Sequence, residues 1–275
     1  MSVPEYRRVS VSCQRTPILR DISLTFPDGK ITALLGPNGC GKTTLLQCLN
    51  GVSRVTKGQI LLDGEDFLSL PPRERARRLS FLPQVRTVIP SLPVRTLVEH
   101  GRFPWLGFAR KKTQKDLRIV KNAMEFAQVI EYADQSVDTL SGGVRQRVFL
   151  AMVLAQDCPV LILDEPTTYL DFQGQRQFCA LLRKLKDQGK TIILTLHDLN
   201  QALRLADHIV VMRGLSPAEP EPVPRLHSHG SFLPKGEIAA CGSASEILSS
   251  HILEEVFNAR LKRFEDKDGV CYFFE

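Results

Sequence analysis

The sequence contains no apolar run of about 18 residues, the length that is needed to cross a bilayer. Its first residues, MSVPEYRRVS, lack the apolar segment of a signal peptide. The seven cysteines form no C-x-x-C pair, so we expect reduced thiols and no disulfide framework. Aromatic residues make up only 7% of the chain, and none interleaves with the scattered arginines and lysines. The net charge of +6 therefore indicates solvated helical faces, as at 73–78, and no nucleic-acid partner.

A glycine-rich turn lies between an apolar run, 31–35, and a helical pattern. The turn has the form G-x-x-x-x-G-K-[ST], whose glycines let backbone N–H groups surround a phosphate at a helix N-terminus. Lys42 is expected to contact the β- and γ-phosphates, and the Thr43 hydroxyl to bind Mg²⁺. The sequence thus predicts a nucleoside triphosphate site. Its residues, called the phosphate loop below, are Gly36, Pro37, Asn38, Gly39, Cys40, Gly41, Lys42, Thr43 and Thr44.

Two further apolar runs are followed by polar residues suited to phosphate chemistry. Asp164 and Glu165 follow the run 160–163, and His197 comes shortly after the run 191–194. Open α/β sheets bind ligands at the carboxyl ends of their strands. Asp164 suits a Mg²⁺ ligand, Glu165 a base for the attacking water, and His197 a contact to the γ-phosphate. We expect strand alternation to give the two acids different roles. Solvated acids and a packing histidine are the alternative.

A second candidate anion site opens the helix that follows the segment LSGG, 140–143. Ser141 is predicted to cap this helix, and Gly142 and Gly143 leave bare N–H groups in its first turn. Such a helix end attracts anions. Taken alone, a Gly-Gly pair before a helix is also common in ordinary loops.

The order of the elements predicts an α/β fold with a phosphate-loop core. Short strands over 5–26 predict an N-terminal antiparallel β subdomain, and a helical pattern with Leu117, Val120, Met124 and Ala127 on one face predicts an inserted helical lobe. After the proline-rich stretch we expect a strand at 237–240, a helix at 245–257 and two strands. We predict one domain, 1–275, whose parts are the core at 1–84 and 158–236, the lobe at 85–157 and the tail at 237–275.

In this order the motifs resemble the ATP-binding subunit of ABC (ATP-binding cassette) transporters, over essentially the whole chain. They are GPNGCGKTT, a strand ending near Gln84, a helical lobe, LSGG, LILDEP, the pair Leu170 and Asp171, and His197. Within that family, PTTYLD, LHDLNQA and GRFP are similar to segments of importers of ferric siderophores, haem and cobalamin. The resemblance implies an ATPase that energises the import of such metal chelates.

The resemblance also implies cofactors and the roles of single residues. ATP and Mg²⁺ would be bound, with Thr43, Gln84 and Asp164 near the metal and Gln84 also near the attacking water. His197 would hold the γ-phosphate. Two copies would form a head-to-tail dimer in which the LSGG segment of one caps ATP on the other, with Asp171 at the interface.

The partners implied are transmembrane permease subunits and, indirectly, an extracytoplasmic substrate-binding protein. The chain would then lie at the cytoplasmic face of the inner membrane as a peripheral subunit. Its permease-facing surface would surround Gln84 and include Phe81, Val88, Pro93 and Trp105.

Some positions depart from the family pattern. Cys13 stands where the family usually has an aromatic residue that stacks on adenine, and Tyr6 is a less well placed substitute. Val144 replaces the glutamine that usually follows LSGG, and the proline-rich segment 213–236 is longer than the usual hairpin. Because Cys40 lies inside the phosphate loop, we expect a bulky adduct on its thiol to block ATP, and ATP to protect the thiol.

Two other functions compete with the importer. A soluble ABC ATPase of DNA repair or translation usually needs a long coiled coil or a second cassette, and this sequence has neither. A non-hydrolysing regulatory module is favoured by Cys13 and Val144 but opposed by the intact Lys42 and Glu165.

Overall fold

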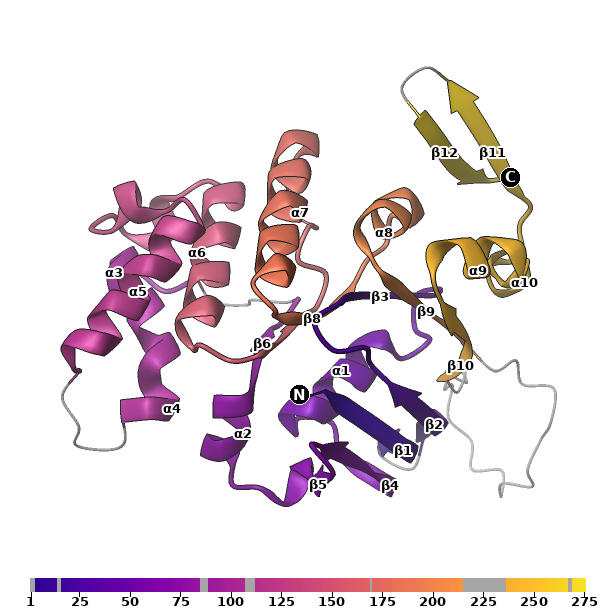
Figure 1. The fold of residues 1–275 in the computed structure, drawn as a ribbon, viewed down its shortest axis with the longest axis horizontal. Coiled ribbons are helices and arrows are strands. Elements are labelled where there is room, and N and C mark those ends of the chain that lie inside the picture. Colours follow the sequence, from indigo (N-terminus) through magenta and orange to yellow (C-terminus); the bar gives the residue numbers. More distant parts are fainter. Residues whose placement is uncertain are drawn as a thin grey trace, which may run out of the picture. The chain divides into compact units, whose positions relative to one another are not determined.

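The computed structural model describes residues 3–13, 16–84, 89–106, 112–168, 170–214, 236–266 and 269–275. These residues fall into two compact units, whose elements are drawn in Figure 1. Unit 1 contains 27–32 and 69–196 with Val3, and unit 2 contains 4–26, 33–68 and 197–275. None of the helices within the described ranges combines the length and apolarity that crossing a membrane requires.

Unit 2 contains the antiparallel β subdomain that the sequence predicts. β1 pairs antiparallel with both β2 and β4, and β4 with β5. In β2 the apolar side chains of Leu19, Ile22 and Leu24 are buried, whereas Arg20 and Asp21 are exposed. The strands of this unit are β1 (Pro4–Cys13), β2 (Thr16–Thr25), β3 (Ile31–Leu35, its first two residues counted with unit 1), β4 (Val55–Leu62), β5 (Glu65–Asp66), β9 (His208–Gly214) and β10 (Gly236–Gly242), in the order β5-β4-β1-β2-β10-β9-β3.

The C-terminal part of unit 2 differs from the prediction of a single helix over 245–257. Two helices form, because His251 adopts a left-handed conformation with φ 56° and breaks the helix. The hydroxyls of Ser249 and Ser250 donate to the carbonyls of Glu246 and Ile247, side-chain bonds that compete with continued helix. The remaining elements of unit 2 are α1 (Lys42–Asn50), the 3₁₀ turn at Phe67–Ser69 (its last residue counted with unit 1), α8 (Leu199–Leu205), α9 (Ala244–Ser249), α10 (Ile252–Phe257) and the hairpin of β11 (Leu261–Asp266) and β12 (Gly269–Phe274).

Unit 1 contains three parallel strands with level carboxyl ends. β6 (Leu79–Leu82), β7 (Val160–Leu163) and β8 (Thr191–Thr195) lie in the order β8-β7-β6, and Leu163 is level with both Leu82 and Leu194. Every residue of β7 and β8 is buried, as in a parallel sheet covered on both faces. The apolar runs 160–163 and 191–194 are thus confirmed as strands, and β6 is the expected strand that ends near Gln84. The level ends bring the residues after each strand to one edge.

The helices of unit 1 include the expected helical lobe. Its helix α5 packs against α3 and α6 through a stripe that includes Val120, Met124 and Ala127. Leu117 was predicted on the same stripe but is 41% exposed, because it lies in the first turn, at the edge of the packed face. The helices are α2 (Pro72–Arg78), α3 (Val94–Glu99), α4 (Phe103–Leu106), α5 (Gln114–Phe126), α6 (Gly142–Ala155) and α7 (Phe172–Asp187), with 3₁₀ turns at His100–Arg102, Ile130–Tyr132 and Val137–Thr139.

Two residues of the segment GRFP make buried contacts that connect elements of the lobe. A Cβ on Gly101 would lie 2.2 Å from the Met152 carbonyl oxygen of α6, so the two backbones meet where only glycine fits. The buried Arg102 guanidinium lies 3.1 Å from the carboxylate of Asp116 and donates to the Ala155 carbonyl at 2.8 Å. The segment GRFP, which is similar to a family motif, therefore has a structural role within the lobe.

The arginines of α2 lie on a helix without a buried residue, as a solvated face requires, and two of them also bind a neighbouring helix. Arg73 and Arg77 each donate from Nε to the carbonyl of Pro104, at 2.8 and 2.9 Å. The Arg77 guanidinium also lies 5.1 Å from the centre of the Trp105 ring. These contacts attach α2 to α4, because the end of a short helix offers carbonyls that arginine can reach.

Candidate active site

The phosphate loop in unit 2 follows the fully buried strand β3 and leads into α1. Gly36 has φ 152°, and a Cβ there would lie 2.3 Å from the Met212 carbonyl oxygen. Gly41 has φ 97° and precedes α1 without a side-chain cap, so no cap side chain takes up the first N–H groups of that helix. The loop has the backbone of a phosphate cradle, in which both glycines are required by conformation and by space.

Lys42 is held inside this loop. Its ammonium donates to the carbonyls of Gly36 at 2.7 Å and Pro37 at 3.0 Å, and the residue is 7% exposed. Cys40 is also buried, and burial raises the pKa of its thiol. A reagent can therefore reach that thiol only when the loop opens, and the protection by ATP stays a prediction.

Asp164 and Glu165 follow β7 in unit 1 but are not on the strand. β7 ends at Leu163, and Glu165 has a left-handed backbone with φ 46°. The prediction that strand alternation separates the two acids is therefore wrong, because a turn does so. Asp164 is buried with 2% exposure, whereas Glu165 is half-buried.

A threonine hydroxyl connects the two acids. Thr195, at the end of β8, donates to Asp164 Oδ1 at 2.7 Å and accepts from the Glu165 backbone N–H at 2.7 Å. Sequence reasoning missed Thr195, because a threonine in a buried strand resembles any β-branched core residue. Its proximity to the acids comes from the level ends of β7 and β8.

Gln84 and Glu165, both predicted to act on water, are brought together. The Gln84 side-chain amide donates to Glu165 Oε2. Thr168, which the sequence analysis did not single out, donates to the same oxygen at 3.2 Å and to the Glu165 carbonyl at 3.2 Å. Buried Gln146 of α6 donates to the Pro166 carbonyl at 2.6 Å and so fixes the turn after the acids. Glu165 thus has an oriented carboxylate.

His197 is exposed, directly after the buried Leu196 that follows β8, and is counted with unit 2. Asp198 caps α8, accepting from the N–H groups of Asn200 and Gln201 at 2.8 and 3.2 Å. The amide of Asn200 instead pairs with the backbone of Tyr272 in β12. The N-terminus of α8 is thus capped by Asp198 and not by Asn200.

The LSGG segment opens α6, as predicted. Ser141 caps the helix, accepting from the Val144 N–H, and both Ser141 and Gly142 are exposed. The nearest atom to a Cβ on Gly143 would be a Leu170 methyl at 3.7 Å, an ordinary contact, so the fold of this chain does not require that glycine. Asp171 is exposed and caps α7 through the Gly174 N–H at 2.7 Å.

Tyr6 cannot replace an adenine-stacking ring. It is 1% exposed, its hydroxyl donates to the Leu45 carbonyl at 2.7 Å, and its ring lies edge-on to Phe26. The structure thus excludes Tyr6 even as a poorly placed substitute for the missing aromatic, because alternation along β1 turns this side chain into the core. Cys13 is exposed at the end of β1.

The residues predicted to face a permease have different environments. Pro93 is exposed, Phe81 is half-buried, and Val88 lies outside the described residues. Trp105 is half-buried, and its indole N–H donates to the Gln156 carbonyl at 2.7 Å. Phe103 beside it is 58% exposed, so it is the more accessible aromatic side chain of α4.

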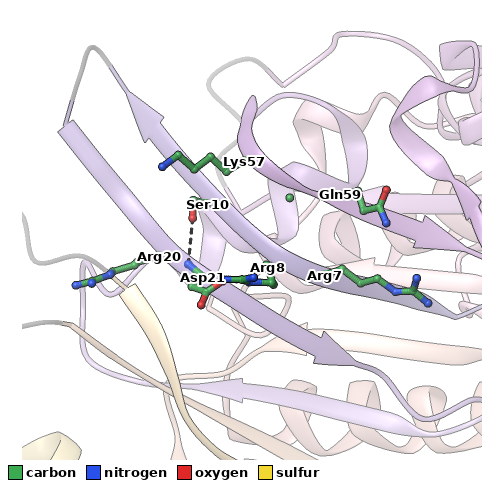
Figure 2. Close-up of a pocket in the computed structure, with 8 residues that line it drawn as sticks. Arg7, Arg8, Ser10, Arg20, Asp21, Lys57 and Gln59 are labelled. Atoms are coloured by element: carbon green, nitrogen blue, oxygen red, sulfur yellow. Dashed lines mark hydrogen bonds and ion pairs between the residues drawn. The ribbon is translucent and has the colours of Figure 1, made fainter.

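A basic hollow of about 710 Å³ lies on the exposed side of β1, β2 and β4 (Figure 2). Arg7 and Arg8 line it and are paired with Glu5 and Asp21. No residue of the phosphate loop lines this hollow. Its residues are Arg7, Arg8, Ser10, Arg20, Asp21, Lys57, Gly58 and Gln59.

Comparisons with known proteins give consistent matches. A family model described as "ABC transporter" matches residues 19–168. The chain is 37% identical to the iron(3+)-hydroxamate import ATP-binding protein FhuC of Bacillus subtilis (strain 168), over 87% of this chain and 82% of that protein. It is also 37% identical to the ferric enterobactin transport ATP-binding protein FepC of Escherichia coli (strain K12), over 90% and 84% of the two chains. The solved structure of a metal-chelate type ABC transporter in an inward-facing conformation has a TM-score of 0.78 at 24% identity, covering 100% of this chain and 97% of that one, and shows the same fold.

Proposed function

The chain belongs to the ABC transporter family as an ATP-binding and ATP-hydrolysing subunit of the importer type, and from this we propose that it energises the uptake of a metal chelate of the siderophore, haem or cobalamin kind. The observation that carries the proposal is the similarity over about nine-tenths of the chain to two ATP-binding proteins, one named for the import and one for the transport of an iron chelate. The same similarity disfavours a soluble ATPase of DNA repair or translation. We also propose that the 275 residues act as one ATPase domain.

ATP is proposed to bind at the phosphate loop. The triphosphate oxygens would take the place of the Gly36 and Pro37 carbonyls around the Lys42 ammonium. The donors available for Mg²⁺ fit a hard cation, because Thr43, Asp164 and Gln84 offer hydroxyl, carboxylate and amide oxygens. When bound, the metal neutralises phosphate charge. His197 is proposed to contact the γ-phosphate.

Glu165 is proposed as the base that accepts the proton of the attacking water. Its carboxylate is oriented by the amide of Gln84 and the hydroxyl of Thr168. Glu165→Gln should lower kcat by about 10²- to 10⁴-fold and leave ATP binding intact. Phosphate release and equilibrium nucleotide binding, measured on the same preparations, test this role. Turnover by Glu165→Gln at the wild-type rate would refute it.

A head-to-tail dimer is proposed to complete the site. Ser141 and Gly142 expose the start of α6, and Gly143 is small without an intramolecular reason. An exposed helix N-terminus with small residues suits the phosphates of ATP held by a second copy. In the Glu165→Gln background, Gly142→Asp should abolish ATP-dependent dimers seen by light scattering while monomers keep their ATP affinity, because a carboxylate repels the triphosphate. Dimers that persist would contradict the capping role. Asp171 is proposed to lie at the same interface.

The partners are proposed to be permease subunits, with the chain at the cytoplasmic face of the inner membrane and a substrate-binding protein acting indirectly. The test is affinity purification of Glu165→Gln, co-expressed with its genomic neighbours, from detergent-solubilised membranes with ATP and Mg²⁺. A stoichiometric polytopic protein is expected. Recovery of nucleic acid or ribosomes on a soluble dimer would instead favour the alternative function.

A further inference from the structure

Thr195 touches both acids at the ends of the parallel strands of unit 1. It is fully buried, and its hydroxyl is the donor to Asp164 Oδ1 and the acceptor from the Glu165 N–H, each at 2.7 Å. A hydroxyl has one proton to give and two lone pairs to receive with, so a single side chain can make both bonds. An apolar side chain of the same shape can make neither.

The backbone of Glu165 needs such support. Its φ of 46° places a residue that has a Cβ in the left-handed region, which is costly and persists only where neighbouring groups hold it. The Thr195 hydroxyl binds the N–H of that strained residue and at the same time the carboxylate of the residue before it. Loss of the hydroxyl would remove one support of the Asp164 carboxylate and one support of the Glu165 backbone.

We propose that Thr195 is a positioning residue for ATP hydrolysis, one that fixes the direction of the Asp164 carboxylate and the backbone of Glu165. The inference rests on the proposed roles of these two acids. Thr195 itself transfers no proton and contacts no phosphate in this account. Its effect therefore belongs to kcat, while the affinity for ATP is set elsewhere by the phosphate loop.

The chain supplies a matched control on the same strand. Thr191, at the other end of β8, is equally buried, donates to Asp28 Oδ1 at 3.1 Å and accepts from the Gly29 N–H at 2.9 Å. Thr191→Val and Thr195→Val thus remove the same two kinds of hydrogen bond from the same strand. Only Thr195→Val removes the hydrogen bonds that hold Asp164 and Glu165.

The experiment compares kcat, KM for ATP, melting temperature and amide hydrogen exchange at Glu165. Thr195→Val should lower kcat roughly 10- to 100-fold, as for other residues that orient a site's ligands, with KM little changed and faster exchange at Glu165. Thr195→Ser should keep most of the wild-type kcat and most of the slow hydrogen exchange at Glu165. Thr191→Val should lower the melting temperature about as much as Thr195→Val does, while its kcat stays at the wild-type value. Equal kcat for Thr195→Val and Thr191→Val would overturn the proposal.

Two further variants separate the possible failures. If Thr195→Val does not fold, Thr195→Cys takes its place, since a thiol is a weaker partner than a hydroxyl and should give a kcat below that of Thr195→Ser. A cysteine variant as active as the serine variant would overturn the positioning role. Glu165→Gln is assayed in the same series. Normal turnover there refutes the proposed base, whereas hydrogen exchange reports on the Thr195 bridge without reference to activity.

Discussion

Replacing Arg102 with methionine should destabilise the helical lobe strongly. The Arg102 and Asp116 side chains are only 5% and 8% exposed, and Nε and Nη2 of the arginine each lie 3.1 Å from Asp116 Oδ1. Arg102→Met leaves that carboxylate buried without its cation, a change that costs about 3–5 kcal/mol of unfolding free energy. At 2–4 °C per kcal/mol for a domain near this size, the melting temperature should fall by roughly 6–20 °C.

The pH dependence of this loss has a defined sign. The pKa of Asp116 is lowered, first by the Thr113 hydroxyl that donates to it and further by Arg102, while burial acts in the opposite direction. A lowered pKa stabilises the fold at pH values above the unfolded pKa of about 3.9, and this stability is lost as the pH falls through the folded pKa. The difference in unfolding free energy between wild type and Arg102→Met should therefore be largest near neutral pH. It should become smaller in acid, because Asp116 becomes neutral.

Urea unfolding at several pH values measures both effects. The control is Lys121→Met, which removes an exposed cation 3.6 Å from Glu125 on the same helix and should cost no more than about 1 kcal/mol. The double variant Arg102→Met/Asp116→Asn should be more stable than the single one, since it buries no unpaired charge. If Arg102→Met costs as little as the control, the reasoning from burial is refuted.

Three further outcomes are expected. Gly101→Ala should lose roughly 1–3 kcal/mol in urea unfolding, because its Cβ would lie 2.2 Å from a backbone oxygen, and wild-type stability would contradict the close packing there. Tyr6→Phe should cost about 1 kcal/mol for its buried hydrogen bond and leave ATP affinity unchanged in equilibrium binding, whereas a large loss of affinity would revive a contact with the base. Iodoacetamide should modify Cys40 far more slowly than the exposed Cys241 when followed by peptide mass spectrometry, since its thiol is buried with a raised pKa, and equal rates would show an open loop.

Contiguous motifs made much of this fold predictable. The strand, turn and helix around Lys42 lie within 31–50, and the buried parallel strands are visible in the sequence as short apolar runs. Ser141 could be identified as a cap because a cap is defined by its nearest neighbours in sequence.

Contacts between distant segments could not be predicted in this way. Thr195 meets Asp164 only because β7 and β8 pair in one particular register, and a single sequence does not reveal that register. Arg102 looked like part of a family motif, yet its partner Asp116 lies on another element of the lobe. Tyr6 was expected to be poorly placed for stacking, but its complete burial could not be predicted, because it depends on which face of β1 meets the core.

The most direct test of the proposed function is ATP-driven uptake of a metal chelate into proteoliposomes that contain this chain and its co-purified permease, with a ferric siderophore, haem and cobalamin assayed in parallel. The account predicts uptake with the wild-type chain in the presence of ATP and Mg²⁺, and a nearly complete loss with Glu165→Gln although ATP still binds. Uptake at the same rate with Glu165→Gln would contradict it.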